Sequence, residues 1–372
     1  MPPDDSEGGF DLFLSYFAEI LLDSAKQWIK LGLAETGDIG LGHLEVLPMR
    51  QVQGLSLGEI LADPSVGTPN EPVLAGPRKA LGELDGEVQR LKAAVVAAVD
   101  QRLERAFAEH PQTEVGRVAQ YAVRGGHRWR AMIAVAAGSI FDDRALETAL
   151  PIACAVELAH AASLILDDLP SMDDAQLRRG RPCAHLVFPR WAVDLAPTLL
   201  LMLGYELILT SPCVSNRRRA AAALDLTQAG LRTVCGQELD LDAEKGPVDP
   251  DRLWRCYRLK SGALFATAAK AGALVCGGGD DEAEDLQCCG TYLGMAYQCA
   301  DDVADVVGHA DQMGKAVGMD VSKTTAVTIL GLTGAEQLVR RFKAEAFRAL
   351  ERFGERANSL RRIIGDVNSI AT

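Results

Sequence analysis

Helical periodicity runs almost without interruption from Gly82 onward, and it constrains the fold of this 372-residue chain more than any other feature. Apolar residues recur every three or four positions in successive stretches, beginning with GELDGEVQRLKAAVVAAVDQRLERAFAE. The connections are short and are marked by Gly, Pro or Asp. No alternating strand pattern of useful length and no short repeat is visible. We therefore expect residues 82–372 to form one large all-α helical bundle.

The composition agrees with helices packed on helices. Hydrophobic residues make up 48% of the chain, enough for a large core, whereas aromatic residues make up only 5%. A mixture dominated by Ala, Leu and Val suits helices better than strands. The formal charge of −13 argues against nucleic acid as a partner, because a phosphate backbone requires a basic surface. A local basic cluster can still receive a phosphorylated small molecule.

The cysteines and the apolar runs indicate a cytoplasmic protein. The nine cysteines are scattered without a CxxC pair, which predicts reduced thiols and no zinc site. The first residues, MPPDDSEGGF, are acidic where a secretory or transit segment would be basic. The apolar run 195–210 carries Pro197 and Glu206 and is too short to span a bilayer, so we expect a core helix.

Residues 1–81 differ from the rest and are expected to form an N-terminal helical and loop extension. Residues 10–34 repeat apolar residues at helical spacing, and a stretch with four prolines follows between residues 64 and 77. One interpretation is an arm that packs on the main body or on a dimer mate. The other is an amphipathic anchor for a membrane or a partner. The sequence leaves both open.

Two knots of carboxylates follow long apolar helical stretches, and the second of them, DDVAD, has helical spacing. Asp301 and Asp305 are four residues apart and therefore face one way on a helix, with Gln298 one turn before them. Asp302 is offset and can hydrogen-bond its neighbours. Clustered carboxylates repel unless a cation neutralises them, and hard oxygen ligands at this spacing suit Mg²⁺. This motif is a candidate metal site.

The first knot, DDLPSMDD, needs a break in its helix. Asp167 and Asp173 are six residues apart, which would point them away from each other on a straight helix. Pro170 lies between them and cannot continue an interior turn. We expect the helix to end near Leu169 and a short bulge to bring Asp173 or Asp174 back beside Asp167. The alternative interpretation is an acidic cap on a loop.

The stretches DDLPSMDDAQLRRGRPCAH and QCADDVADV resemble the two aspartate-rich motifs of the trans-isoprenyl diphosphate synthases, and most closely short-chain bacterial geranylgeranyl diphosphate synthases. The resemblance covers roughly residues 82–345. It implies an isoprenoid synthase fold, a homodimer, and three Mg²⁺ ions that bridge to the diphosphate of an allylic substrate. It implies as metal residues Asp167, Asp168 and Asp173 for two ions and Asp301 for the third, with Asp302 and Asp305 supporting.

The same resemblance assigns residues to two diphosphate sites. For the allylic diphosphate it implies Arg178, Lys260, Ser261, Gln298, Lys315 and Lys323. For isopentenyl diphosphate it implies His127, Arg130, His160 and Arg179. His127 departs from the family, which has lysine there. Histidine can donate to phosphate, but its charge depends on pH. The chain also ends in VNSIAT, where many relatives carry a basic tail.

Chain length of the product is expected to depend on the helix before the first knot. Ser163 lies four residues before Asp167 and almost beneath it, with Ala162 beside it. Both are small, and a fifteen-carbon ceiling would require a bulky side chain near this place. We therefore expect the twenty-carbon product, geranylgeranyl diphosphate, although Met172 or other helices can set a different floor.

Three functions follow from these motifs. The first is a Mg²⁺-dependent prenyltransferase that condenses allylic diphosphates with isopentenyl diphosphate head to tail (1′-4). The second is a class I terpene cyclase of the same fold, favoured only by His127 and opposed by Arg130, His160 and Arg179. The third, a non-catalytic partner subunit, is opposed by the complete metal and cation sets. Neither knot has the spacing of a helical calcium loop.

Overall fold

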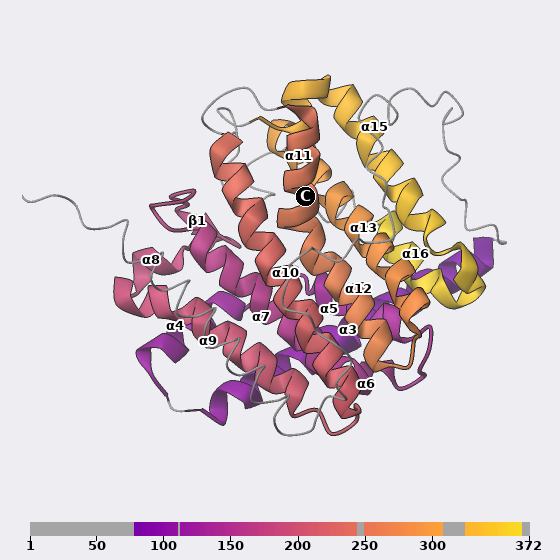
Figure 1. The fold of residues 1–372 in the computed structure, drawn as a ribbon, viewed down its shortest axis with the longest axis horizontal. Helices are drawn as coiled ribbons and strands as arrows, with labels where there is room; N and C mark the ends of the chain where they lie inside the picture. The colour runs from indigo at the N-terminus through magenta and orange to yellow at the C-terminus, as the bar shows by residue number, and fades with distance from the viewer. Residues whose placement is uncertain (1–77, 111, 244–248, 308–323, 367–372) are drawn as a thin grey trace, which may run out of the picture. The chain divides into compact units, whose positions relative to one another are not determined.

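The computed structural model describes residues 78–110, 112–243, 249–307 and 324–366, and the predicted all-α class is confirmed (Figure 1). Contacts divide the chain into Met1–Gly54 and Leu55–Thr372, and every described residue belongs to the second unit. The helices are α3 (Arg78–Ala108), α4 (Glu114–Val123), α5 (Trp129–Gly138), α6 (Ala145–Thr148), α7 (Leu150–Asp167), α8 (Ala184–Val187), α9 (Arg190–Leu209), α10 (Asn216–Ala243), α11 (Pro250–Tyr257), the π-helix η1 (Arg258–Gly262), α12 (Ala263–Val275), α13 (Asp280–Val307), α15 (Ala326–Arg348), the 3₁₀ helix η2 (Glu351–Ala357) and α16 (Asn358–Gly365).

A small β-hairpin, which the sequence did not predict, interrupts the helices after the first carboxylate knot. Strands β1 (Leu177–Arg178) and β2 (Arg181–Pro182) pair antiparallel, with Leu177 opposite Pro182. Each strand has two residues, too few for an alternating pattern to be recognised. Gly180 lies in the turn at φ +70°, a conformation that favours glycine. The hairpin carries the arginines of the RRGR stretch.

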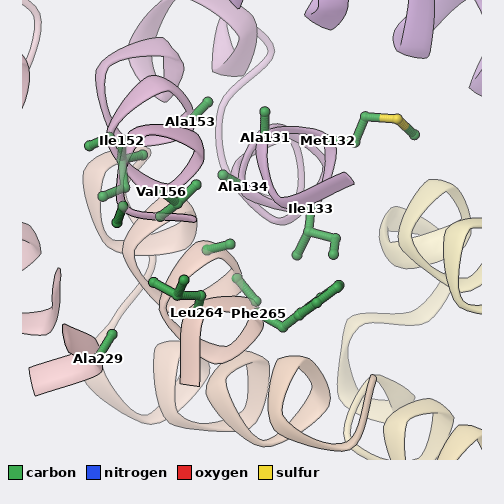
Figure 2. Packing of buried hydrophobic residues seen from close by; sticks show 14 of the residues in the cluster. Ala131, Met132, Ile133, Ala134, Ile152, Ala153, Val156, Ala229, Leu264 and Phe265 are labelled. Carbon is green, nitrogen blue, oxygen red and sulfur yellow. The ribbon is translucent and has the colours of Figure 1, made fainter. Parts of the chain in front are cut away.

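Helix α12 lies at the centre of the bundle. It packs against α5, α7, α10 and α13, and α13 in turn packs against α15 (Figure 1). Figure 2 shows the apolar side chains where α5, α7 and α12 meet, among them Ile133, Val156 and Phe265. Gly272 allows the closest approach, because a Cβ there would lie 2.2 Å from the backbone oxygen of Ala134. Small residues let the helices approach closely, so that the core is filled with few aromatic side chains.

Two helices among the described residues have the length and hydropathy of a membrane span, α7 and α9. Within the protein, 61% of the α7 stretch and 50% of the α9 stretch are buried. Helix α9 includes the run predicted to be a core helix, and one side of it packs on α4 and α7. Apolar side chains on one side of α9 are therefore buried against its neighbours, while those on the other side are exposed.

All nine cysteines are present as thiols rather than in disulfide bonds, in agreement with the predicted reduced thiols. Most are buried, and burial raises the pKa of the Cys154 thiol to about 12. A thiol with so high a pKa is almost entirely protonated and unreactive near neutral pH. The buried cysteines are therefore packing residues, and cytoplasmic localisation stays a prediction.

The predicted N-terminal extension lies almost entirely outside the described residues. Helix α3 begins at Arg78, four residues before the start expected at Gly82. Both interpretations of residues 10–34, a packed arm and an amphipathic anchor, therefore stay predictions. The domain boundary between residues 81 and 82 likewise stays a prediction.

Candidate active site

The first aspartate motif folds back on itself as predicted. Helix α7 ends at Asp167, and the backbone N–H of Asp173 donates to the Asp167 carbonyl oxygen at 2.9 Å. The N–H of Asp174 donates to the carbonyl oxygen of Leu169 at 3.0 Å, and Asp174 adopts φ +47°. The turn around Pro170 thus returns Asp173 to the end of α7. An unbroken helix would have separated the two aspartates.

Several carboxylates gather around Asp167. Burial raises the pKa of Asp167 to about 6; Lys260 and Arg178 oppose the increase, whereas the carboxylates of Asp173 and Asp240 add to it. Lys260 Nζ donates to Asp240 Oδ2 at 2.5 Å. Burial alone would lower the pKa of Lys260, but Asp240 and Asp167 outweigh it, so the net shift is upward. Two cations, Lys260 and Arg178, thus act on Asp167 together with the neighbouring carboxylates.

Asp168, predicted as a metal residue, pairs with Arg178 in this structure, and its role as a metal ligand stays a prediction. Its side chain is 7% exposed, and its Oδ1 accepts hydrogen bonds from Arg178 Nε at 3.0 Å and Nη2 at 2.6 Å. A charge-assisted pair of this kind fixes the guanidinium firmly. The two carboxylates of the DD pair are therefore divided: Asp167 lies in the acidic cluster, and Asp168 positions Arg178.

The π-helix η1 connects the two aspartate motifs. Lys260 reaches the first motif, whereas the next residue, Ser261, donates from Oγ to Gln298 Oε1 at 2.6 Å, one turn before the second motif. π-Helical turns occur frequently at functional sites. Gly236 of α10 permits this placement, because a Cβ there would lie 2.3 Å from the backbone nitrogen of Lys260. The predicted Lys-Ser pair therefore lies between the two motifs.

In the second aspartate motif Asp302 hydrogen-bonds its neighbours, as its offset position on the helix predicted. Asp302 is 4% exposed and accepts hydrogen bonds from Tyr257 Oη, from Gln298 Nε2 at 3.2 Å and from the Ala326 N–H at 2.9 Å. Burial raises the pKa of Asp302 to about 7, although these three donors act against the increase. These hydrogen bonds agree with the supporting role expected of Asp302, and its part in the metal site stays a prediction.

The other two aspartates of this motif differ in exposure. Asp301 is half-buried and Asp305 is 6% exposed. Their predicted roles in the metal site stay predictions. Lys315 and Lys323, predicted to complete the allylic site, lie outside the described residues.

A cluster of positively charged side chains surrounds His160. Burial lowers the pKa of His160 well below its usual range, and the guanidinium groups of Arg130, Arg179, Arg178 and Arg128, in decreasing order, lower it further. Burial also lowers the pKa of Arg130 and of Arg179, while Glu157 opposes both decreases. Arg130 lies over the Phe265 ring at 4.5 Å, and its buried Nε has no hydrogen-bond partner. Such mutually repelling cations suit an anionic ligand.

The hairpin and the glycine loop between α4 and α5 build this cluster together. Arg179 Nη1 donates to the carbonyl oxygens of Ala122 and Gly125, both at 3.2 Å. Gly126, at φ +88°, leaves room for the guanidinium, since a Cβ there would lie 2.8 Å from Arg179 Cζ. The predicted residues Arg130, His160 and Arg179 are thus brought together, and His127 is exposed on the same loop.

Residues 112–360 match the sequence profile of the family described as Polyprenyl synthetase. The chain belongs to this polyprenyl synthetase family. It is 38% identical to the farnesyl diphosphate synthase of Escherichia coli over 72% of this chain and 93% of that protein. It is 36% identical to geranylgeranyl pyrophosphate synthase 6 of Arabidopsis thaliana over 65% and 76%.

Solved structures agree with this assignment. An FPP/GFPP synthase from Zymomonas mobilis is 31% identical, with a TM-score of 0.65 over 75% of this chain and 99% of that one. A geranyltransferase from Helicobacter pylori, complexed with magnesium and isoprenyl diphosphate, shares the fold at 23% identity, with a TM-score of 0.64 over 74% and 96%. The protein is a short-chain trans-isoprenyl diphosphate synthase, a prenyltransferase that elongates prenyl diphosphates.

The residues around Asp167 fit the Mg²⁺ that is typical of this polyprenyl synthetase family. Mg²⁺ prefers carboxylate oxygens with water and phosphate oxygens, and the carboxylates of Asp173 and Asp240 lie close enough to Asp167 to raise its pKa. Within the part of the chain that the structure describes, no three His, Cys, Asp or Glu side chains are gathered as a ready-made metal site. Like charges keep carboxylates apart until a cation neutralises them. Asp167, Asp173 and Asp301 are the residues that would hold it.

Sequence reasoning missed several residues of this synthase site. Asp240 pairs with Lys260, Glu157 Oε1 accepts from the Ala131 N–H at 3.1 Å, and Arg128 donates to Asp100 at 2.7 Å. Tyr257 contacts the second aspartate motif. For Asp240 the sequence does carry a signal, the acidic stretch GQELDLD near the end of α10. In the structure the glycine that begins this stretch lies against Lys260.

The depressed pKa of His160 predicts a pH-dependent loss of stability. His160 stays neutral in the folded chain at pH values where an unfolded histidine binds a proton. Unfolding therefore takes up a proton below about pH 6.5, and stability falls as the pH falls from there toward the lower folded pKa. We expect the difference in Tm between about pH 7.5 and about pH 5.5 to be smaller in His160→Gln than in the natural chain. An equal Tm difference in both proteins would show that His160 does not cause the loss of stability at low pH.

Proposed function

We propose that this synthase condenses isopentenyl diphosphate head to tail with allylic diphosphates and releases geranylgeranyl diphosphate. One observation carries the proposal: two clusters of charged side chains with different chemistry, which we take as an acidic pocket and an arginine pocket. The first is the acidic cluster with Lys260, which suits a metal-bound diphosphate. The second holds His160 with Arg130 and Arg179 and suits a diphosphate without metal. Two such clusters support two diphosphate substrates.

The acidic pocket would take the allylic substrate. Asp167, Asp173 and Asp301 would hold Mg²⁺, three ions by resemblance to the family, and the metal neutralises charge on the departing diphosphate. Arg178, fixed by Asp168, and Lys260, fixed by Asp240, present cations to the same diphosphate. Their carboxylate partners hold both cations in place before substrate arrives, so that little reorganisation is needed during the reaction.

The arginine pocket would take isopentenyl diphosphate. The C1–O bond of the allylic substrate breaks, C4 of isopentenyl diphosphate bonds to that C1, and a proton leaves C2. The released diphosphate accepts this proton, so the protein needs no carboxylate base. Arg130, Arg179 and His160 hold the second diphosphate at a fixed place, which orients C4 toward the allylic carbon.

Small side chains below the first motif support the twenty-carbon product. Ala162 is 3% exposed, and half-buried Ser163 donates from Oγ to the His160 carbonyl oxygen at 2.9 Å. Ser163 precedes Asp167 by one helical turn, so a chain that extends from the acidic pocket along α7 passes this position.

Enlarging Ser163 is expected to shorten the product. In Ser163→Phe the ring fills the space below Asp167, and the main product should change from twenty to fifteen carbons, as measured by chromatography of labelled products. Leu164→Phe is the matched control, because Leu164 is the next residue on α7 and points about 100° away. Twenty-carbon product from Ser163→Phe would show that another surface limits the chain.

The structure does not favour the cyclase alternative. A cyclase acts on one diphosphate and gives no reason for a second cationic pocket. In this chain Arg179 braces the glycine loop through two carbonyl oxygens, and Arg130 is buried over Phe265. This pocket is built from three separate elements, which is evidence for a second substrate.

We propose that the synthase is a homodimer that pairs through α9 and α10. Large apolar side chains are exposed at one-face spacing on both helices: Trp191, Leu195 and Met202 on α9, and Leu224 and Leu231 on α10. Leu231 alone is 61% exposed. Contiguous apolar patches of this kind mark interaction surfaces.

A charge on this face is expected to separate the protomers. Leu231→Arg would bury an unpaired charge in the dimer, and light scattering after size exclusion should then report a monomer. Leu332→Arg, at a 37% exposed leucine of α15, is the control and should leave the dimer intact. A monomeric natural chain at micromolar concentration would contradict the proposed dimer.

A further inference from the structure

A continuous set of buried hydrogen bonds connects Tyr257 to the Lys-Ser turn. Tyr257 Oη donates to Asp302 Oδ2, and Gln298 Nε2 donates to Asp302 Oδ1 at 3.2 Å. Ser261 Oγ donates to Gln298 Oε1 at 2.6 Å. The N–H of Ala326, the first residue of α15, donates to both Tyr257 Oη and Asp302 Oδ2 at 2.9 Å. This network joins α11, η1, α13 and α15.

The network determines which way the Gln298 amide points. An amide has a donor end and an acceptor end, whereas an ionised carboxylate only accepts. Asp302 therefore requires the Nε2 end of Gln298, and Oε1 is left for Ser261 on the side of Lys260. Asp302 is held in turn by Tyr257 and Ala326 on its other oxygen. Without these donors Asp302 can rotate, and the amide loses its fixed direction.

Tyr257 is placed so that only its hydroxyl takes part in this network. The residue is 4% exposed, and its ring packs edge-on against Trp254 at 5.7 Å. A phenylalanine would fill the same space and keep the same ring contact. Removing the hydroxyl would leave the Ala326 N–H and Asp302 with one partner fewer each. A buried polar group that loses its partner is costly, so the local arrangement would change.

We propose that Tyr257 is a positioning residue for chain elongation, which orients Gln298 through Asp302 and holds the first turn of α15 against α13. The inference rests on the proposed function, because it takes Ser261 and Gln298 to belong to the allylic site. Tyr257 does not touch substrate in this account. It acts through the second aspartate motif, and it gives buried Asp302 a role other than metal binding.

The test compares Tyr257→Phe with Tyr205→Phe. Tyr205 is also partly buried and also has one side-chain hydrogen bond, to Thr227 at 2.8 Å, but it lies on α9, away from both aspartate motifs. We expect Tyr257→Phe to lower kcat about 10- to 100-fold, as removal of a supporting hydrogen bond does at metal sites. The KM for isopentenyl diphosphate should stay within about 2-fold, since the arginine pocket is unchanged. Tyr205→Phe should keep both constants.

A double-mutant cycle separates positioning from a general loss of stability. If Tyr257 acts through Asp302, Tyr257→Phe combined with Asp302→Asn should lower kcat no more than the worse single change. Tyr205→Phe combined with Asp302→Asn should give the product of the two single effects. Multiplicative effects of Tyr257→Phe and Asp302→Asn would overturn the proposal, as would an unchanged kcat in Tyr257→Phe.

Hydrogen exchange provides a readout that needs no activity. The amides of residues 325–331, at the start of α15, should exchange faster in Tyr257→Phe than in the natural chain, and at the natural rate in Tyr205→Phe. Unchanged exchange in Tyr257→Phe would overturn the contact with α15. If the natural chain forms no product, both the proposed function and the positioning role of Tyr257 are overturned. If the natural chain is active but exchange in Tyr257→Phe is unchanged, only the positioning role is overturned.

Discussion

Replacing Asp173 with asparagine is expected to lower kcat by about 10²- to 10³-fold, the loss typical of removing one group that stabilises the developing charge. Asp173 is hydrogen-bonded through its backbone to Asp167, and its carboxylate raises the pKa of both Asp167 and Lys260. Asparagine keeps the size of the side chain but removes the charge that would hold Mg²⁺. Steady-state kinetics at several Mg²⁺ concentrations measures the effect.

The neighbouring residue supplies a matched control. Asp174 is exposed and adopts φ +47°, a conformation that asparagine also tolerates. Asp174→Asn removes the same charge one residue further along the chain, and kcat should stay within about 2-fold because that carboxylate is exposed to solvent. Equal losses in the two variants would mean that the turn, rather than the Asp173 carboxylate, supports catalysis.

Replacing Arg179 with alanine is expected to raise the KM for isopentenyl diphosphate by about 10- to 100-fold, as the loss of a hydrogen bond between charged groups does. The guanidinium lies in the pocket of His160 and also holds the carbonyl oxygens of Ala122 and Gly125. The KM for the allylic substrate should change little, because the acidic pocket contains none of these groups. Initial rates with each substrate varied in turn measure the two constants.

A surface arginine controls for the change in net charge. Arg117 of α4 is 67% exposed and pairs only with Glu114 of its own helix among the described contacts. Arg117→Ala should leave both KM values unchanged. A rise in the allylic KM of Arg179→Ala equal to the rise for isopentenyl diphosphate would contradict the assignment of two separate pockets.

The sequence predicted those parts of the fold that depend on local pattern. Helical periodicity from Gly82 predicted the all-α class, and Pro170 predicted the turn that returns Asp173 to Asp167. Both follow from backbone geometry over a few residues. The π-helix at Lys260 was not predictable in this way, because its extra residue depends on the contact with Gly236, more than twenty residues earlier.

The site was predictable only as far as the resemblance named its residues. Sequence spacing could not show that Asp168 would pair with Arg178, because Arg178 lies in the β-hairpin that the sequence did not predict. It could not show that Asp302 would be buried against Tyr257, since that contact depends on how distant helices meet. Asp240 was missed for the same reason: its partner Lys260 comes from another helix. Residue type and spacing thus indicate which side chains belong to the site, whereas the packing of the helices decides which of them face the substrate.

The most direct test of two diphosphate pockets is incubation of the full chain with Mg²⁺ and labelled isopentenyl diphosphate. Parallel reactions would contain dimethylallyl, geranyl or farnesyl diphosphate, and one would contain unlabelled geranylgeranyl diphosphate alone. We expect labelled twenty-carbon diphosphate from all three allylic starters and no product from the last reaction. No incorporation of label, together with a hydrocarbon or terpene alcohol from geranylgeranyl diphosphate alone, would contradict the account and indicate a cyclase.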